Sequence, residues 1–157
     1  MNEYENLPSL IQSLQLQETE FTFIAIFCVN QPDAWKDDPR KRSVFDDNQK
    51  NLQYLQDLEL DFVEVIDYSS PGKGWDEKNY GVGRARKTAM DAANEQASDK
   101  DIIFSMDADT FYPPEYLQAT TENLLANPEA MGVAIPYYHP LPANEKAARA
   151  MLRYEIY

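Results

Sequence analysis

Cysteine, histidine and long apolar runs are scarce in this sequence. It holds one cysteine and one histidine in 157 residues, so neither a disulfide framework nor a cysteine-based zinc cluster can form around Cys28. The longest apolar run, residues 21–29, is far shorter than the roughly 18 residues of a membrane-spanning helix. The first residues also lack the basic region of a secretory signal. These absences predict a chain without a transmembrane segment and of cytoplasmic type.

Positive charge is scarce as well. Fourteen lysines and arginines stand against twenty-seven aspartates and glutamates, which gives a formal net charge of −13. Because such a field repels phosphate backbones, we expect no nucleic acid among the partners. The hydrophobic share of 43% and the charged share of 26% are those of an ordinary globular protein. The length suits a single domain with one core.

Apolar residues recur with helical or strand periodicity along most of the chain. Short apolar runs predict four strands, at residues 21–29, 61–66, 101–106 and 131–135. Helical patterns lie before, between and after them, at residues 7–14, 48–58, 83–97, 113–125 and 143–157. This alternation predicts the α/β fold class, with a mostly parallel sheet that carries helices on both faces.

Two aspartates, Asp107 and Asp109, follow the expected third strand and are separated by one small residue. In an extended segment, residues i and i+2 point to the same side, so both carboxylates could face one ligand. Carboxylate oxygens suit Mg²⁺ or Mn²⁺, and ligands gather at the carboxyl ends of parallel strands. The same rule selects Asn30, Gln31 and residues 67–70. The alternative, that the two aspartates only cap a strand and begin a turn, stays open.

A basic segment lies between Lys73 and Lys87, where five basic side chains stand against two acidic ones. Arginine can grip a phosphate with two donors. Arg86 lies near the start of an expected helix, where backbone amides also attract anions, so it is a candidate diphosphate ligand. The alternative is a solvated helix start. His139, in a proline-rich loop, is assigned no role.

These elements together resemble the N-terminal part of a GT-A glycosyltransferase of family 2. The matching segments are two strands at 24–30 and 65–70, the helix start at 83–87, and the Asp-x-Asp motif at 106–109. The resemblance implies a Rossmann-like half of a nucleotide-diphospho-sugar transferase. It further implies a single nucleotide-sugar-binding domain over residues 1–157, truncated at its C-terminus before the acceptor half.

The resemblance also implies roles for individual residues. Asn30 would border the base and ribose, Asp67 would bind the nucleobase, and Arg86 would bind the nucleotide-sugar. Asp107 would lie near the ribose and the metal, and Asp109 would ligate the Mn²⁺ or Mg²⁺ cofactor. The donor would be a UDP- or GDP-sugar, transferred with inversion to an unidentified hydroxyl acceptor. No residue is assigned as the catalytic base, so we expect the chain to bind nucleotide better than it turns over substrate.

Two other functions remain open from the sequence. A haloacid-dehalogenase-like phosphatase also ends a strand with Asp-x-Asp, but Phe111 occupies the place where that class has threonine or valine. The other alternative is a noncatalytic module that binds nucleotide-sugars. If the chain lacks the acceptor half of a glycosyltransferase, the apolar surface left exposed could drive it to form a homodimer.

Overall fold

The computed structural model describes residues 3–139 and 141–156 of the chain. It divides into two compact units, Met1–Glu122 and Asn123–Tyr157. The elements follow one another as η1 (Glu3–Glu5), α1 (Leu7–Gln15), β1 (Ala25–Asn30), η2 (Asp33–Lys36), α2 (Arg42–Asp57), β2 (Val63–Tyr68), α3 (Val82–Gln96), α4 (Tyr116–Ala126) and α5 (Glu145–Ile156).

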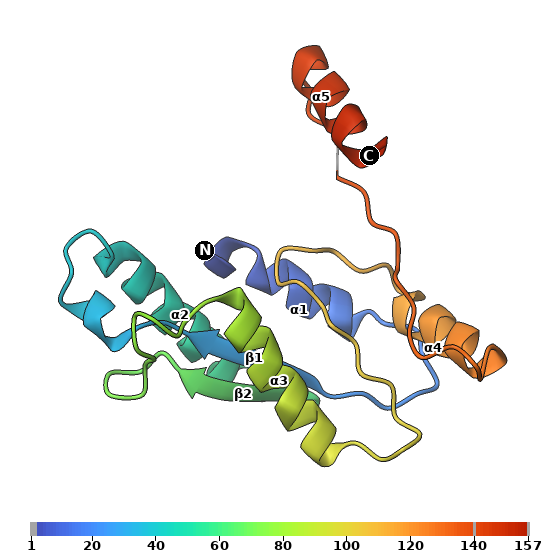
Figure 1. Ribbon diagram of the computed structural model, residues 1–157, viewed down its shortest axis with the longest axis horizontal. Coiled ribbons are helices and arrows are strands. Elements are labelled where there is room, and N and C mark those ends of the chain that lie inside the picture. Colours follow the sequence, from blue (N-terminus) through green and yellow to red (C-terminus); the bar gives the residue numbers. More distant parts are fainter. Residues whose placement is uncertain (1–2, 140, 157) are drawn as a thin grey trace. The chain divides into compact units, whose positions relative to one another are not determined.

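The sheet is parallel, which confirms the predicted α/β class. Strand β1 pairs with β2 in a register that runs from Ala25 opposite Val63 to Asn30 opposite Tyr68. Parallel neighbours need a long crossover, and helix α2 supplies it (Figure 1). As a result, the two carboxyl ends, and the polar loops that follow them, lie side by side.

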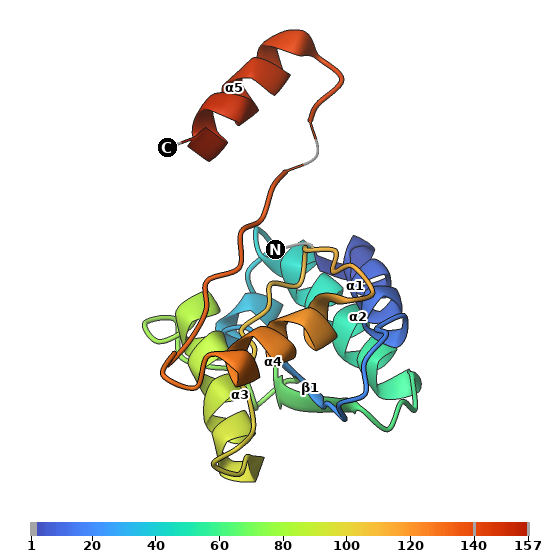
Figure 2. The ribbon, with the colours of Figure 1, turned by 90° about the vertical axis from the view of Figure 1, so that its right-hand side faces the viewer.

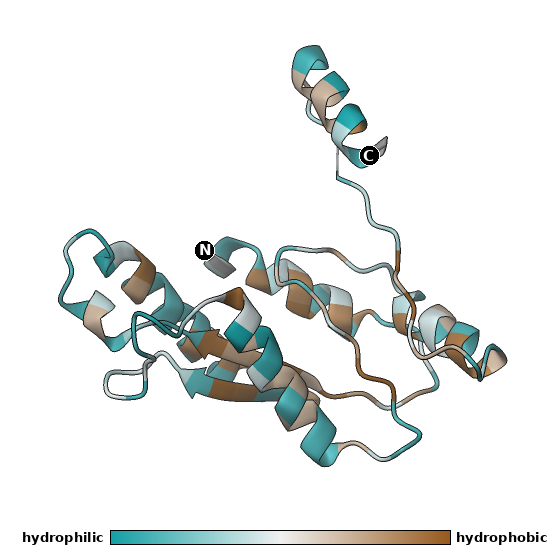
Figure 3. Cartoon of the chain, in the orientation of Figure 1, coloured by the Kyte–Doolittle hydropathy of each residue, from teal (hydrophilic) through white to brown (hydrophobic). Residues whose placement is uncertain are grey.

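Helices cover both faces of this sheet, as predicted. Helices α1 and α2 lie on one face and α3 lies on the other (Figure 2). The core on the first face is formed by apolar residues of α1, β1 and α2 together with Tyr112; its buried members are Leu7, Leu10, Ile11, Leu14, Val29, Leu52, Leu55 and Tyr112. Figure 3 shows the apolar residues concentrated along the strands. Helix α3 packs on β1 but has no buried residue.

The predictions of strands at 101–106 and 131–135 are wrong. Among the residues that the structure describes, only β1 and β2 are strands, and the sheet has two strands instead of four. Segment 101–106 has no strand partner, although Met106 packs against the core. In segment 131–135, Met131 is fully exposed, at 101%. An apolar run becomes a strand only where a neighbouring strand takes up its backbone hydrogen bonds.

The predicted helices are confirmed, with shifted ends; the last position of the predicted helix at 143–157 lies outside the described residues. Helix α2 begins at Arg42 rather than at residue 48, because buried Phe45 extends its apolar face toward the N-terminus. Helix α3 begins at Val82, close to the predicted start. Across the described ranges, none of the helices has the length and apolar character needed to cross a membrane.

Candidate functional site

The loops that follow β1 and β2 are joined by a buried glutamine. Gln31 is 1% exposed, and its Nε2 donates to the Ser69 carbonyl oxygen at 2.7 Å. Its Oε1 accepts a hydrogen bond from Asn48 Nδ2 at 3.0 Å. Its backbone N–H donates to the Tyr68 carbonyl at 3.0 Å, and its carbonyl accepts from the Trp75 N–H at 2.9 Å. Gln31 therefore fixes the loop after β2 against the end of β1.

Asp33 and Gly74 hold the same two loops in contact farther along. One carboxylate oxygen of Asp33, Oδ1, accepts hydrogen bonds from the Gly72 N–H at 2.9 Å and the Gly74 N–H at 3.1 Å. A Cβ at position 74 would lie 2.7 Å from the Asp33 backbone nitrogen and 2.8 Å from the Gln31 carbonyl oxygen. The approach of the two backbones therefore requires glycine at position 74.

The carboxylate of Asp67, at the end of β2, is held by local donors. Its Oδ1 accepts from the backbone N–H groups of Ser69, at 3.0 Å, and Ser70, at 2.9 Å. Its Oδ2 accepts from Lys73 Nζ at 2.9 Å, and the side chain is only 13% exposed. Burial opposes ionisation, but these hydrogen bonds outweigh it and hold the pKa of Asp67 below its ordinary value. Asp67 is thus a fixed negative charge beside Asn30.

Asn30 ends β1 at the same edge of the sheet as Asp67, because Asn30 is paired with Tyr68 and Val29 with Asp67. The Asn30 side chain is partly buried, and its Nδ2 donates to the Cys28 carbonyl at 3.4 Å. Asn48 Nδ2 also reaches the Asn30 carbonyl oxygen at 3.4 Å. The structure therefore brings Asn30 and Asp67 together at one end of the sheet, as the sequence predicted.

Trp75 is the buried residue of the basic segment between Lys73 and Lys87, and its ring packs against Arg84. Its ring centroid lies 5.1 Å from that of Tyr68, and the Arg84 guanidinium carbon lies 4.3 Å from the same ring. A cation over an indole face is attracted by the ring electrons, so Arg84 is engaged in packing.

The cysteine of β1, Cys28, is not a candidate nucleophile. Burial raises the pKa of the Cys28 thiol to about 11, which keeps this cysteine protonated and unreactive at neutral pH.

Arg86, the arginine singled out in the basic segment, contacts the Asp-x-Asp motif. Its Nη2 donates to Asp107 Oδ1, and both side chains are largely accessible to solvent, at 45% and 61%. Arg86 lies in the first turns of α3, and Asp107 ends the extended segment 101–106. The basic segment and the Asp-x-Asp motif, which lie apart in the sequence, are therefore joined by an ion pair in the structure.

The turn that carries Asp107 and Asp109 is closed by Tyr112 and Thr110. The Asp107 N–H donates to the Tyr112 hydroxyl at 3.0 Å, and this hydroxyl lies 3.3 Å from the Asp107 carbonyl, to which it donates. The Thr110 N–H reaches the same carbonyl at 3.4 Å. Burial raises the pKa of the Tyr112 phenol, which keeps the hydroxyl protonated at neutral pH.

The donor set of this turn fits a hard divalent cation. Asp107 and Asp109 are both exposed, and Asp109 accepts no hydrogen bond from any residue in the described ranges. No cluster of three or more histidine, cysteine, aspartate or glutamate ligands occurs in those ranges. Mg²⁺ and Mn²⁺ suit such a site, because they commonly take one or two carboxylates and complete their shell with phosphate oxygens and water.

The sequence did not single out Asp33, Asn48, Trp75 or Tyr112. Each of these residues forms hydrogen bonds or packing contacts between segments or across a turn. The periodicity of apolar residues in the sequence does not reveal such contacts. The one sequence signal available for Tyr112 was its position three residues after the Asp-x-Asp motif.

Of the predicted site residues, Arg86 and Asp107 are joined by an ion pair, and Asn30 and Asp67 lie at the same edge of the sheet. No hydrogen bond or ion pair within the described residues links these two groups, and none joins Asp109 to the other predicted site residues.

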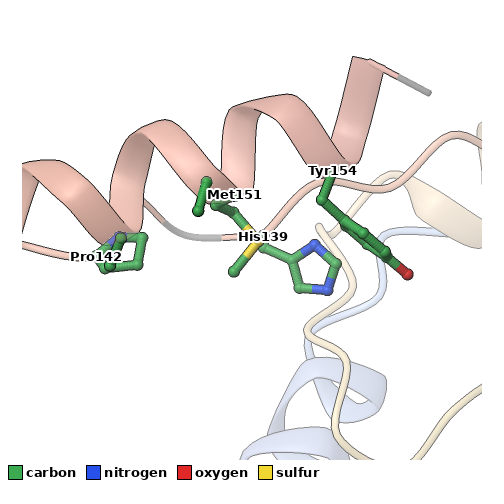
Figure 4. Close-up of a pocket in the computed structure, with 6 residues that line it drawn as sticks. His139, Pro142, Met151 and Tyr154 are labelled. Atoms are coloured by element: carbon green, nitrogen blue, oxygen red, sulfur yellow. The ribbon is translucent and has the colours of Figure 1, made fainter.

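The second unit has a shallow hollow between the segment before residue 140 and helix α5. Its volume is about 450 Å³, and the lining residues include His139, Met151 and Tyr154 (Figure 4). His139 Nδ1 lies 3.0 Å from Glu155 Oε1. The backbone N–H and the ring of His139 lower the pKa of Glu155. This contact joins α5 to the preceding segment.

In a parallel α/β unit, ligands bind at the carboxyl ends of the strands, and this is where Asn30, Gln31 and Asp67 lie. A family model, glycosyl transferase family 2, matches residues 75–156, just over half of the chain. The chain belongs to glycosyl transferase family 2, as the resemblance predicted, and membership supports a general role in glycosyl transfer. The matched range contains α3, the Asp-x-Asp turn, α4 and α5; β1 and β2 precede it. Searches of curated proteins and of solved structures found no match.

Proposed function

We propose that this chain binds the nucleotide-sugar donor of an inverting, metal-dependent glycosyltransferase. The observation that carries the proposal is the ion pair between Arg86 and Asp107. It joins the start of α3 to the Asp-x-Asp turn inside the range that matches the family. An arginine beside a carboxylate pair offers both a phosphate ligand and metal ligands.

In this proposal the donor is a UDP- or GDP-sugar, and its two ends meet different parts of the site. The base and ribose contact Asn30 and Asp67 at the ends of the two strands. Asp67 Oδ2, which accepts from Lys73, has a further lone pair with which it could accept a hydrogen bond from a base N–H. The diphosphate reaches Arg86, whose other partner, Asp107, lies near the ribose and the metal.

Asp109, together with Asp107, would hold Mn²⁺ or Mg²⁺, which would offset the negative charge that builds on the departing nucleoside diphosphate. The acceptor hydroxyl attacks the anomeric carbon from the face opposite the diphosphate. A new C–O bond forms while the bond to the diphosphate breaks, so the configuration inverts. A carboxylate base takes the hydroxyl proton; we assign this role to no residue of the chain.

The organisation of the chain as a single nucleotide-sugar-binding domain over residues 1–157 stays a prediction.

Thermal unfolding with UDP or GDP, with and without Mn²⁺, tests the proposal. A ligand at 100 times its Kd stabilises the folded state by about 2.7 kcal/mol, which raises Tm by several degrees. We expect this rise with one of the two nucleotides, and only when Mn²⁺ is present. The variant Asp109→Asn should lose it, whereas the matched control Asp99→Asn, at another exposed aspartate, should keep it.

Two results would overturn the proposal. One is the absence of any metal-dependent rise with either nucleotide in the wild-type chain. The other is an equal rise in the wild-type chain and in Asp109→Asn. A phosphate-release assay on a generic phosphoester covers the phosphatase alternative, and we expect it to stay at background.

A further inference from the structure

A single hydroxyl group serves both backbone groups of Asp107. The Tyr112 Oη accepts from the Asp107 N–H at 3.0 Å and donates to the Asp107 carbonyl, 3.3 Å away. The N–H···O distance is normal, and the O–H···O distance is somewhat longer than the usual upper value of about 3.0 Å. Tyr112 therefore determines how the backbone runs at the point where the Asp-x-Asp turn begins.

The hydrogen bonds between Tyr112 and Asp107 take the place of the ladder hydrogen bonds that a neighbouring strand would provide. At a strand end inside a sheet, ladder hydrogen bonds fix the backbone. Segment 101–106 has no such partner in the described structure, so Asp107 is held from the side by Tyr112. The side chain of Asp107 is largely exposed and gains no order from burial.

Tyr112 is itself firmly placed. It is 7% exposed and belongs to the core formed with α1 and α2. Its ring centroid lies 4.7 Å from that of Tyr116, at the start of α4. A ring fixed in this way allows its hydroxyl little freedom, so the position of the Asp107 backbone is tied to the core.

We propose that Tyr112 is a positioning residue of the donor site, which holds the Asp107 backbone so that the Asp107 and Asp109 carboxylates face the diphosphate and its metal together. The inference rests on the proposed function. Tyr112 itself touches neither ligand. Groups that orient metal-binding carboxylates in this way typically account for 10- to 100-fold in metal affinity or activity.

The test compares Tyr112→Phe with Tyr116→Phe. Each variant removes one hydroxyl and keeps the ring in the same aromatic pair, and no hydrogen bond of the Tyr116 hydroxyl is present within the described residues. Calorimetric titration with Mn²⁺ and UDP or GDP, whichever binds the wild-type chain, gives the affinity. Electron paramagnetic resonance gives the Mn²⁺ affinity and the shape of the bound-metal signal, which a purely structural role would leave unchanged.

We expect Tyr112→Phe to weaken metal-dependent nucleotide binding about 10-fold and to broaden the bound-Mn²⁺ signal. Hydrogen exchange at the Asp107 amide should become faster. Tyr116→Phe should match the wild-type chain in all three measurements, and far-UV circular dichroism should show both variants folded.

The outcomes separate the two proposals. If the wild-type chain binds no nucleotide with Mn²⁺, the proposed function fails and the positioning role fails with it. If the wild-type chain binds while Tyr112→Phe retains wild-type affinity and signal shape, only the positioning role is overturned. An equal loss of affinity in Tyr112→Phe and Tyr116→Phe also overturns it, because the effect then belongs to the aromatic packing.

Discussion

The two ends of the proposed donor site are held in different ways. At the base end, the loops after β1 and β2 are buried and cross-linked, with Gln31 and Ser69 each 1% exposed. At the diphosphate end, Asp107 is 61% exposed and depends on one tyrosine hydroxyl and one arginine. Substitutions at the first end should therefore lower the free energy of unfolding, whereas those at the second should lower ligand affinity and leave stability nearly unchanged.

The largest loss of stability is expected from Gln31→Leu. The substitution removes two side-chain hydrogen bonds in a buried position and leaves the Asn48 amide short of its nearest acceptor. Unsatisfied buried polar groups cost about 1–3 kcal/mol each, so we expect a loss of about 3 kcal/mol in urea unfolding. The control Gln56→Leu, on the exposed side of α2, should change stability by less than about 0.5 kcal/mol. Equal effects of the two substitutions would contradict the role given to Gln31.

A smaller loss is expected from Gly74→Ala. The new Cβ would meet backbone atoms of Asp33 and Gln31 at less than 3 Å, and such forced shifts cost about 1–3 kcal/mol. Gly83→Ala is the control, because a Cβ there meets nothing within 4 Å and lies in α3, where alanine is the better helix former. Chemical unfolding should show the first variant destabilised and the second unchanged or more stable. If Gly74→Ala were as stable as the wild-type chain, the loops after β1 and β2 could move apart to accept a Cβ, and the close approach assigned to Gly74 would be contradicted.

Asp67→Asn should have a smaller, pH-dependent effect of about 1 kcal/mol at neutral pH, from weakened hydrogen bonds. The folded-state pKa of Asp67 is lowered, so its charge stabilises the fold fully above its ordinary pKa of about 3.9. That contribution declines as the pH falls below this value toward the lowered pKa. The stability difference between the two proteins should therefore shrink steadily as the pH falls from about 4 toward 2. A stability difference that is constant over this range would refute the assignment.

The smallest effect on stability is expected from Arg86→Gln. Exposed ion pairs contribute about 0–1 kcal/mol, so the free energy of unfolding should change by less than about 0.5 kcal/mol. Nucleotide affinity in the presence of Mn²⁺ should nevertheless fall about 10-fold, because a diphosphate ligand is lost. Arg149→Gln, which breaks an exposed pair with Glu145 in α5, is the control and should leave affinity unchanged. A large loss of stability in Arg86→Gln would place Arg86 among the structural residues instead.

The same contrast explains what the sequence could predict. The parallel pair β1 and β2 and the five α-helices follow from local periodicity, whereas the two short 3-10 helices η1 and η2 were not predicted. The rule for carboxyl ends of strands placed Asn30 and Asp67 at one edge of the sheet. The apolar run at 101–106 has the composition of a strand, but strand formation depends on a partner elsewhere in the chain. Tyr112, Trp75 and Asp33 were missed because their roles come from contacts between segments, which one-dimensional patterns do not contain.

The binding of Mn²⁺ in the presence and absence of nucleotide tests whether the Asp-x-Asp turn and Arg86 form one site for the metal and the diphosphate. If one site holds both ligands, each must raise the affinity of the other by the same factor. Electron paramagnetic resonance should show that UDP or GDP raises the Mn²⁺ affinity at least 10-fold in the wild-type chain and in Asp99→Asn, but not in Asp109→Asn. Mn²⁺ affinity that neither nucleotide changes, or that rises equally in Asp109→Asn, would contradict the account.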